Sequence, residues 1–71
     1  MAKKIAVELE LSMDKWLRFY RESEKLFKTK EPREALKRLL AAAILLTIGD
    51  IDMETAKKIL YEGIDYEQLL R

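Results

Sequence analysis

The sequence predicts a mainly α-helical fold with one N-terminal β-strand, in a chain that forms a homodimer and ends in a short helical tail. Three observations support this prediction. The first dozen residues alternate apolar and polar side chains, the later apolar residues recur at helical spacing, and the second predicted helix ends without a charged face. A lone strand needs a partner strand, and a helix that is apolar on all sides must be buried on all sides. A second copy of the chain meets both needs, and two-fold dimers are the commonest homo-oligomers.

The predicted strand covers residues 4–11, in the segment KKIAVELELS. In an extended chain, alternate side chains point to opposite faces. One face carries Ile5, Val7, Leu9 and Leu11, and the other carries Ala6, Glu8 and Glu10. Because no second strand is predicted, we expect this strand to pair antiparallel with its symmetry mate and to form an intermolecular β-ribbon.

Two longer helices are predicted after the strand. The first covers residues 13–27, and Ser12 is suited to be its N-cap. The second covers residues 32–48, with Pro32 in its first turn and Gly49 at its C-terminal end. Its second half, LLAAAILLTI, carries no charge, so we expect the dimer to bury it.

The chain divides by charge into a basic domain, residues 1–48, and an acidic tail, residues 49–71. The first part holds eleven Lys or Arg and seven Asp or Glu, and the second holds three and six, so their net charges are +4 and −3. The sequence of the tail predicts a short helix over residues 53–61, with Asp52 as its N-cap and Gly63 as the residue that ends it. The charge asymmetry indicates two partners, or a tail that folds onto the basic domain.

The composition argues against an enzyme or a metal protein. The chain has 71 residues and contains neither histidine nor cysteine, so the usual general base, thiol nucleophile and zinc ligands are missing. We therefore expect no catalytic residue, no metal and no cofactor. A hydrophobic content of 49% is high for so short a chain, which on its own buries only ~60% of its unfolded surface. The high hydrophobic content therefore also favours oligomerisation.

The sequence predicts a cytoplasmic protein without a membrane segment. Glu8 and Glu10 interrupt the N-terminal apolar residues before they reach the length of a signal peptide. The longest uncharged run, residues 39–49, is far shorter than the ~20 residues that span a bilayer. Charged residues make up 38% of the chain, a composition that resembles the proteins of thermophiles.

The order of these elements resembles the ribbon-helix-helix family, of the Arc and MetJ repressor type. The match covers residues 4–48, in the order VELELS, first helix, KTKEP, second helix. The resemblance implies a dimer whose β-ribbon enters the major groove of DNA. It also implies a role as an antitoxin, since many members bind operator DNA with this part and inhibit a toxin, often a PIN-domain ribonuclease, with their C-terminal segment. The turn departs from the family, which often has glycine and serine where this chain has residues 28–32.

The resemblance also assigns candidate DNA-binding residues. The outward strand positions, which read bases in the family, are Ala6, Glu8 and Glu10. The candidate phosphate anchors are Lys3, Lys4, Lys28, Lys30 and Arg33. Glutamate can accept a hydrogen bond from cytosine, but four carboxylates in a dimer oppose the electrostatic attraction to phosphates. A protein-interaction module that binds no DNA is therefore the alternative function.

The tail carries the candidate partner-binding residues. These are Ile51, Met53, Ile59, Leu60, Tyr61, Tyr66, Leu69 and Leu70. An acidic segment with this much apolar surface suits a basic partner, to which it would bind through aromatic and leucine anchors. The family resemblance implies that this partner is a toxin such as a PIN-domain ribonuclease. Completion of the dimer core by the same side chains is the alternative.

Overall fold

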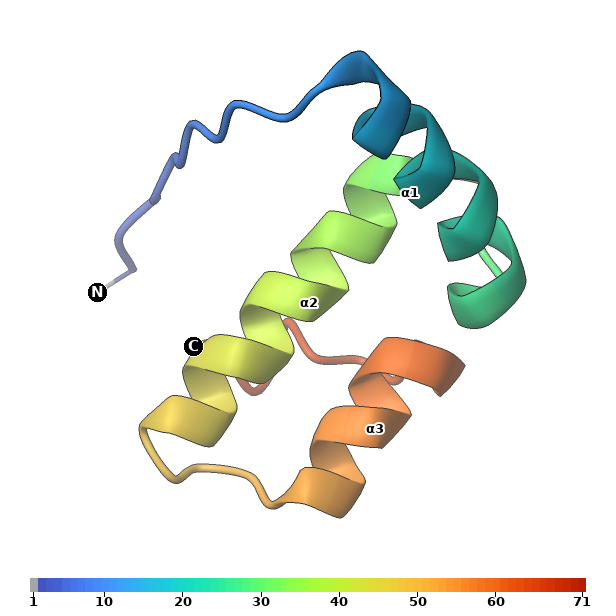
Figure 1. Ribbon diagram of the computed structural model, residues 1–71. Helices are drawn as coiled ribbons and strands as arrows, with labels where there is room; N and C mark the ends of the chain where they lie inside the picture. The colour runs from blue at the N-terminus through green and yellow to red at the C-terminus, as the bar shows by residue number, and fades with distance from the viewer. Residues whose placement is uncertain (1) are drawn as a thin grey trace.

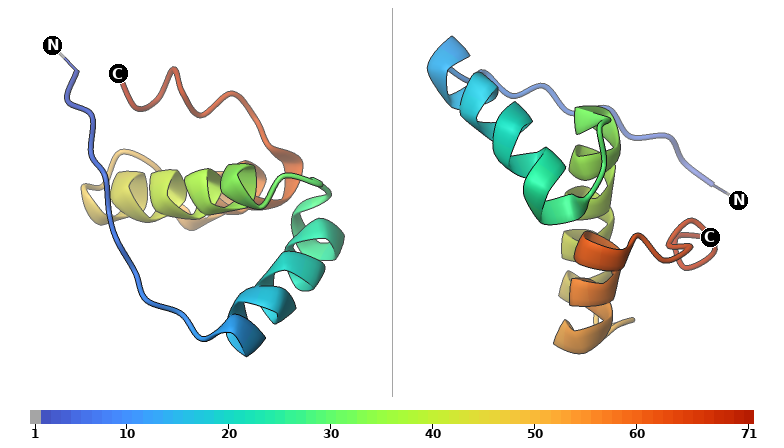
Figure 2. Two further views of the ribbon diagram at one scale, coloured as in Figure 1. Left: turned by 90° about the horizontal axis from the view of Figure 1, so that it is seen from above. Right: turned by 90° about the vertical axis from the view of Figure 1, so that its right-hand side faces the viewer.

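The computed structural model describes residues 2–71 and contains, over that range, three α-helices (Figure 1). They are α1 (Met13–Phe27), α2 (Pro32–Thr47) and α3 (Met53–Glu62). α2 is central: α3 runs antiparallel beside it, and the C-terminal half of α1 lies against its N-terminal end (Figures 1 and 2). The N-terminal half of α1 projects away from the other helices, and the first described residues lie on the same side of α2 as the C-terminal end (Figure 2).

The prediction of an N-terminal strand, and with it of a ribbon-helix-helix fold, is wrong. Residues 2–12, here called the arm, are extended, but no strand occurs among the described residues and the fold is all-α. A strand exists only when its backbone pairs with another strand. After the arm, the described residues form helices, turns and loops, so the chain offers the arm no strand to pair with. Alternation of side chains alone therefore does not make a β-ribbon, and the ribbon-helix-helix fold requires one.

The predicted helices are confirmed to within one residue at each end. α1 has the predicted bounds, and the Ser12 hydroxyl accepts a hydrogen bond from the Lys15 N–H at 3.3 Å. α2 ends one residue early and α3 ends one residue late. Asp52 caps α3 by accepting from the Thr55 N–H at 2.8 Å, and this bond holds the pKa of the Asp52 carboxyl below its ordinary value.

The core lies between α2, α3 and the segment that follows α3. It contains three side chains of α2, two of α3 and one tyrosine of the last segment: Ala41, Ala42, Leu45, Ala56, Ile59 and Tyr66. The alanines let the two helices approach closely, and Leu45 and Ile59 fill the space between them. The tail thus packs onto one face of α2 within a single chain.

One arginine joins the three helices. The Arg38 side chain, only 13% exposed, donates from Nη1 to the backbone carbonyls of Phe27 at 2.8 Å and Leu60 at 3.4 Å. These carbonyls belong to the last turns of α1 and α3, where no N–H of the helix is left to bond them. The positive charge also lies at the negative end of both helix dipoles. Glu34 neutralises the guanidinium, with 3.4 Å between Nε and Oε1.

Alanine substitutions at Gly49 and Gly63 are expected to distinguish the cost of backbone strain from the cost of displacing Arg38. Gly63→Ala and Gly49→Ala each place a side chain at positive φ, +64° and +80°, which costs roughly 1–2 kcal/mol. Only at Gly63 would the new Cβ lie 2.5 Å from Arg38 Nη2, whereas Gly49 faces open space. We expect Gly63→Ala to lower the unfolding free energy by about 1.5–3 kcal/mol more, the usual range for hydrogen bonds to a charged group.

Thermal and urea unfolding followed by circular dichroism measure this difference. For a chain of this size, each kcal/mol corresponds to a loss of about 4–8 °C in Tm. Equal losses in the two variants would show that the Arg38 contacts contribute nothing to stability.

Candidate interaction surfaces

A basic cluster surrounds the N-terminal end of α2. It consists of Lys28, Lys30 and Arg33, all exposed. The chain turns at Lys28, whose φ is +54°, and the N-cap residue Glu31 makes no side-chain hydrogen bond to the helix. Among residues 2–71, the ion pairs engage other basic residues and none of these three. The cluster therefore presents three positive charges without an ion-pair partner, with the one negative charge of Glu31 among them, beside a helix end that also favours anions.

The other predicted DNA-binding residues lie on the arm, where Lys3, Lys4, Ala6, Glu8 and Glu10 are all exposed. The arm leads away from the turn between α1 and α2, so a single chain does not bring Lys3 and Lys4 together with the basic cluster (Figures 1 and 2). Glu8 and Glu10 lie between the two groups along the chain. No common anion-binding surface forms within one chain.

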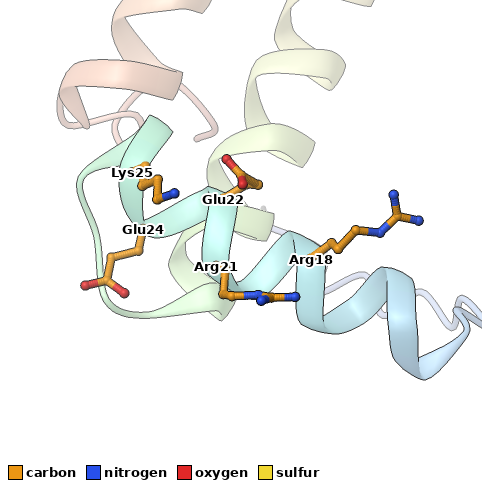
Figure 3. A pocket seen from close by; sticks show the side chains of 5 residues that line it. All are labelled: Arg18, Arg21, Glu22, Glu24 and Lys25. Atoms are coloured by element: carbon orange, nitrogen blue, oxygen red, sulfur yellow. The ribbon is translucent and has the colours of Figure 1, made fainter.

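A second charged surface lies on α1 and has mixed sign. A hollow of about 710 Å³ is lined by Arg18, Arg21, Glu22, Glu24 and Lys25. Figure 3 shows that these side chains all come from α1 and spread in different directions. Arg18 is also paired with Asp14 at 3.3 Å, and both side chains are largely exposed. Opposite charges that are free to move in water give no built site, and we assign this hollow no function.

Large apolar side chains are exposed over much of the molecule. On the arm they are Ile5, Val7, Leu9 and Leu11, on α1 Met13, Leu17, Tyr20 and Leu26, and on α2 Leu36, Leu40 and Ile44, followed by Ile48. The chain exposes 6242 Å², whereas a compact monomer of 8.4 kDa exposes about 4,600 Å². The excess, about 1,600 Å², is roughly twice the ~800 Å² that each partner buries in an interface of standard size.

The arm, α2 and the C-terminal segment enclose a small apolar groove. Its volume is about 250 Å³, and it is lined by Ile5, Val7, Lys37, Leu40, Ala41, Ile44, Tyr66 and Leu70. Lys37 lies at the groove with Glu67 3.5 Å away, so its charge is balanced. The arm borders the groove without filling it, since Ile5 and Val7 remain 71% and 68% exposed. The groove is smaller than the ~300–1,000 Å³ of typical small-molecule sites and suits one or two side chains.

The predicted partner-binding residues of the tail fall into two sets. Ile59 and Tyr66 are buried, and Ile51 and Leu60 are partly buried against the same core. The other four, Met53, Tyr61, Leu69 and Leu70, are exposed. Only the exposed set can meet a partner while the tail remains packed on α2.

The described residues contain neither a metal-binding group nor a membrane helix. Between residues 2 and 71, no three acidic side chains lie close enough together to hold a metal ion. In the same range, none of the helices has the length and apolar character needed to cross a bilayer.

The Arg38 contacts are the feature that sequence reasoning missed. The spacing of Glu34 and Arg38, four residues apart on a helix, is a visible signal for their ion pair. Nothing in the sequence indicates which backbone carbonyls the guanidinium meets, because they lie 11 and 22 residues away. The hydrogen bond from the Tyr66 hydroxyl to Glu34, at 3.1 Å, is hidden for the same reason.

Comparisons with protein families, with curated proteins and with solved structures find no significant match to this chain. Its function has to be inferred from its own residues.

Stability is expected to fall at alkaline pH through Tyr66. Burial, together with the hydrogen bond to Glu34, raises the pKa of Tyr66 from 10.0 to about 12. The unfolded chain therefore loses this proton first, and the contribution of Tyr66 to stability is complete below pH 10 and is lost as the pH rises through about 12. Tyr66→Phe should remove this part of the alkaline loss.

The measurement is the slope of the unfolding free energy against pH between about 9 and 12, a window set by the tyrosine pKa values. Tyr61→Phe is the matched control, because it removes a tyrosine hydroxyl from an exposed position. An unchanged slope in Tyr66→Phe would contradict the raised pKa.

Proposed function

We propose that this protein is a cytoplasmic DNA-binding regulator of the repressor or antitoxin class that acts as a homodimer. The observation that carries the proposal is the basic cluster of Lys28, Lys30 and Arg33 at the N-terminal end of α2. Lysine and arginine side chains beside free backbone N–H groups are the donors that bind DNA phosphates. In a homodimer this cluster occurs twice, so two phosphate-binding surfaces act on one duplex.

The proposal assigns most of the affinity to phosphates rather than to bases. Glu8 and Glu10 add negative charge to the arm, and each would have to be placed away from the DNA backbone. Phosphate binding releases counterions, so affinity depends steeply on salt and weakly on sequence.

The antitoxin role rests on the exposed part of the tail. Met53, Tyr61, Leu69 and Leu70 offer apolar anchors on a segment whose net charge is −3. A basic toxin, such as a PIN-domain ribonuclease, is the partner whose charge complements this segment. Ile59 and Tyr66 stay in the core in this proposal, so toxin binding does not require the tail to unfold.

A protein-interaction module that binds no DNA is the second candidate. The extent of the exposed apolar surface favours it, because such surfaces on soluble proteins mark sites of protein association. In that case the basic cluster serves solubility, and the protein acts by joining copies of itself or other chains.

Removing two lysines of the basic cluster should weaken DNA binding and its salt dependence. If Lys28 and Lys30 each contact one phosphate, Lys28→Ala with Lys30→Ala should reduce the slope of log K against log salt by about 2 for each chain that contacts the duplex. The control is Lys57→Ala with Lys58→Ala, which removes the same charge from exposed positions on α3. It should leave the slope nearly unchanged.

Fluorescence anisotropy with a random duplex of about 20 base pairs, between about 50 and 200 mM salt, measures these slopes. Absence of binding at the lowest salt concentration would favour the interaction module. Equal losses in the two double variants would show that net charge, rather than the cluster, drives binding.

A further inference from the structure

We propose that the exposed face of α2 is the surface through which two copies of this chain associate, with the two α2 helices packed against each other. The face carries Leu36, Leu40, Ile44 and Ile48, which are 38%, 51%, 45% and 62% exposed. This inference rests on the homodimer of the proposed function and names its interface. It does not depend on DNA binding.

These four side chains form a single ridge. They are spaced four residues apart, so they lie along one of the rows by which helices interlock. The ridge spans 12 residues, roughly 18 Å along the helix axis at 1.5 Å per residue. A small ligand cannot cover a row of this length, whereas a second helix can.

Hollows lie on both sides of the ridge. One is the apolar groove that Leu40 and Ile44 share with the arm and the C-terminal segment. The other has a volume of about 230 Å³ and is lined by Ala43, Ile44, Thr47 and Ile48, where the two small side chains leave space beside the two isoleucines. A ridge flanked by hollows on the same helix can interlock with an identical ridge. Such self-complementarity is what a two-fold axis requires.

The charge of this face also fits a second copy. The whole chain exposes about 1,600 Å² more than a compact monomer of its mass, and the α2 face contributes part of that excess, together with the arm and α1. Residues 39–49 carry no charge, so two identical faces meet without repulsion or the burial of an unpaired ion. Interlocking of the two rows gives a crossing angle of about −50° between the helices.

Cross-linking through a single introduced cysteine tests this geometry. The chain has no cysteine of its own, so the background is clean. Ala43→Cys places a thiol beside the ridge near its middle, where the two helices would cross, and a disulfide forms only when the two Cα atoms come within about 7 Å. We expect most of the Ala43→Cys protein to form a covalent dimer under mild oxidation. Lys57→Cys, on the exposed side of α3, should remain at the background level.

A charge on the ridge provides the second test. Ile44→Glu should shift the mass in sedimentation equilibrium at micromolar concentration from dimer to monomer while circular dichroism shows that the helices remain. Lys57→Glu is the control and should stay dimeric. If Ile44→Glu does not fold, Thr47→Lys, which replaces an exposed side chain beside the ridge, takes its place.

The outcomes separate this inference from the proposed function, because both tests are made without DNA. Loss of DNA binding in a protein that still cross-links at Ala43→Cys leaves the α2 interface standing and removes the regulator role. A wild-type chain that is a monomer at micromolar concentration overturns the interface. A dimer that persists in the charged variants, or equal cross-linking at both cysteine positions, overturns it as well.

Discussion

The arrangement of the three helices depends on the Arg38 guanidinium. A helix ends with carbonyl groups that have no partner within the helix, and they must find donors elsewhere when they are shielded from water. Arg38 supplies such donors to α1 and α3 at the same time, through Phe27 and Leu60. Because it stands on α2, it fixes the ends of both other helices to the central one. Glu34 makes this possible, since a largely buried cation without a counter-charge would be costly.

This contact matters most for α1, which has little else to hold it. All of α1 is described, and only Ser23 and Phe27 in its C-terminal part are buried. Phe27 also packs near Tyr61 of α3, with 5.9 Å between the ring centroids. The N-terminal half of α1 therefore projects from the rest of the molecule, and α1 is anchored only at its C-terminal end (Figure 2). The exposed apolar side chains of that half are the consequence.

The two faces of α2 differ in the size of their side chains, and this difference decides which face is buried within one chain. Ala41 and Ala42 are buried in the core that α2 forms with α3 and the C-terminal segment, where small side chains allow close packing. Leu40 and Ile44, on the other side of the same turns, are large and exposed. Within one chain, α3 and the C-terminal segment cover only the small-residue face, and the arm is too short and extended to cover the other. The proposed homodimer follows from that imbalance, with the basic cluster left free at the N-terminal end of α2.

Local structure could be predicted from the sequence because it depends on residues that are close together along the chain. Ser12, Asp52 and Gly63 act through backbone groups one to four residues away, and the helix bounds they indicate agree with the structure to within one residue. The basic residues of the candidate site and the apolar residues of the tail are visible in the same way. What the tertiary structure decided depends on distant pairing. The arm alternates like a strand but has no strand to meet, Ile59 and Tyr66 are buried while Tyr61 and Leu69 are exposed, and Arg38 bonds carbonyls that no local pattern identifies. Each of these outcomes depends on which surfaces come together in space, and residue spacing along the chain does not carry that information.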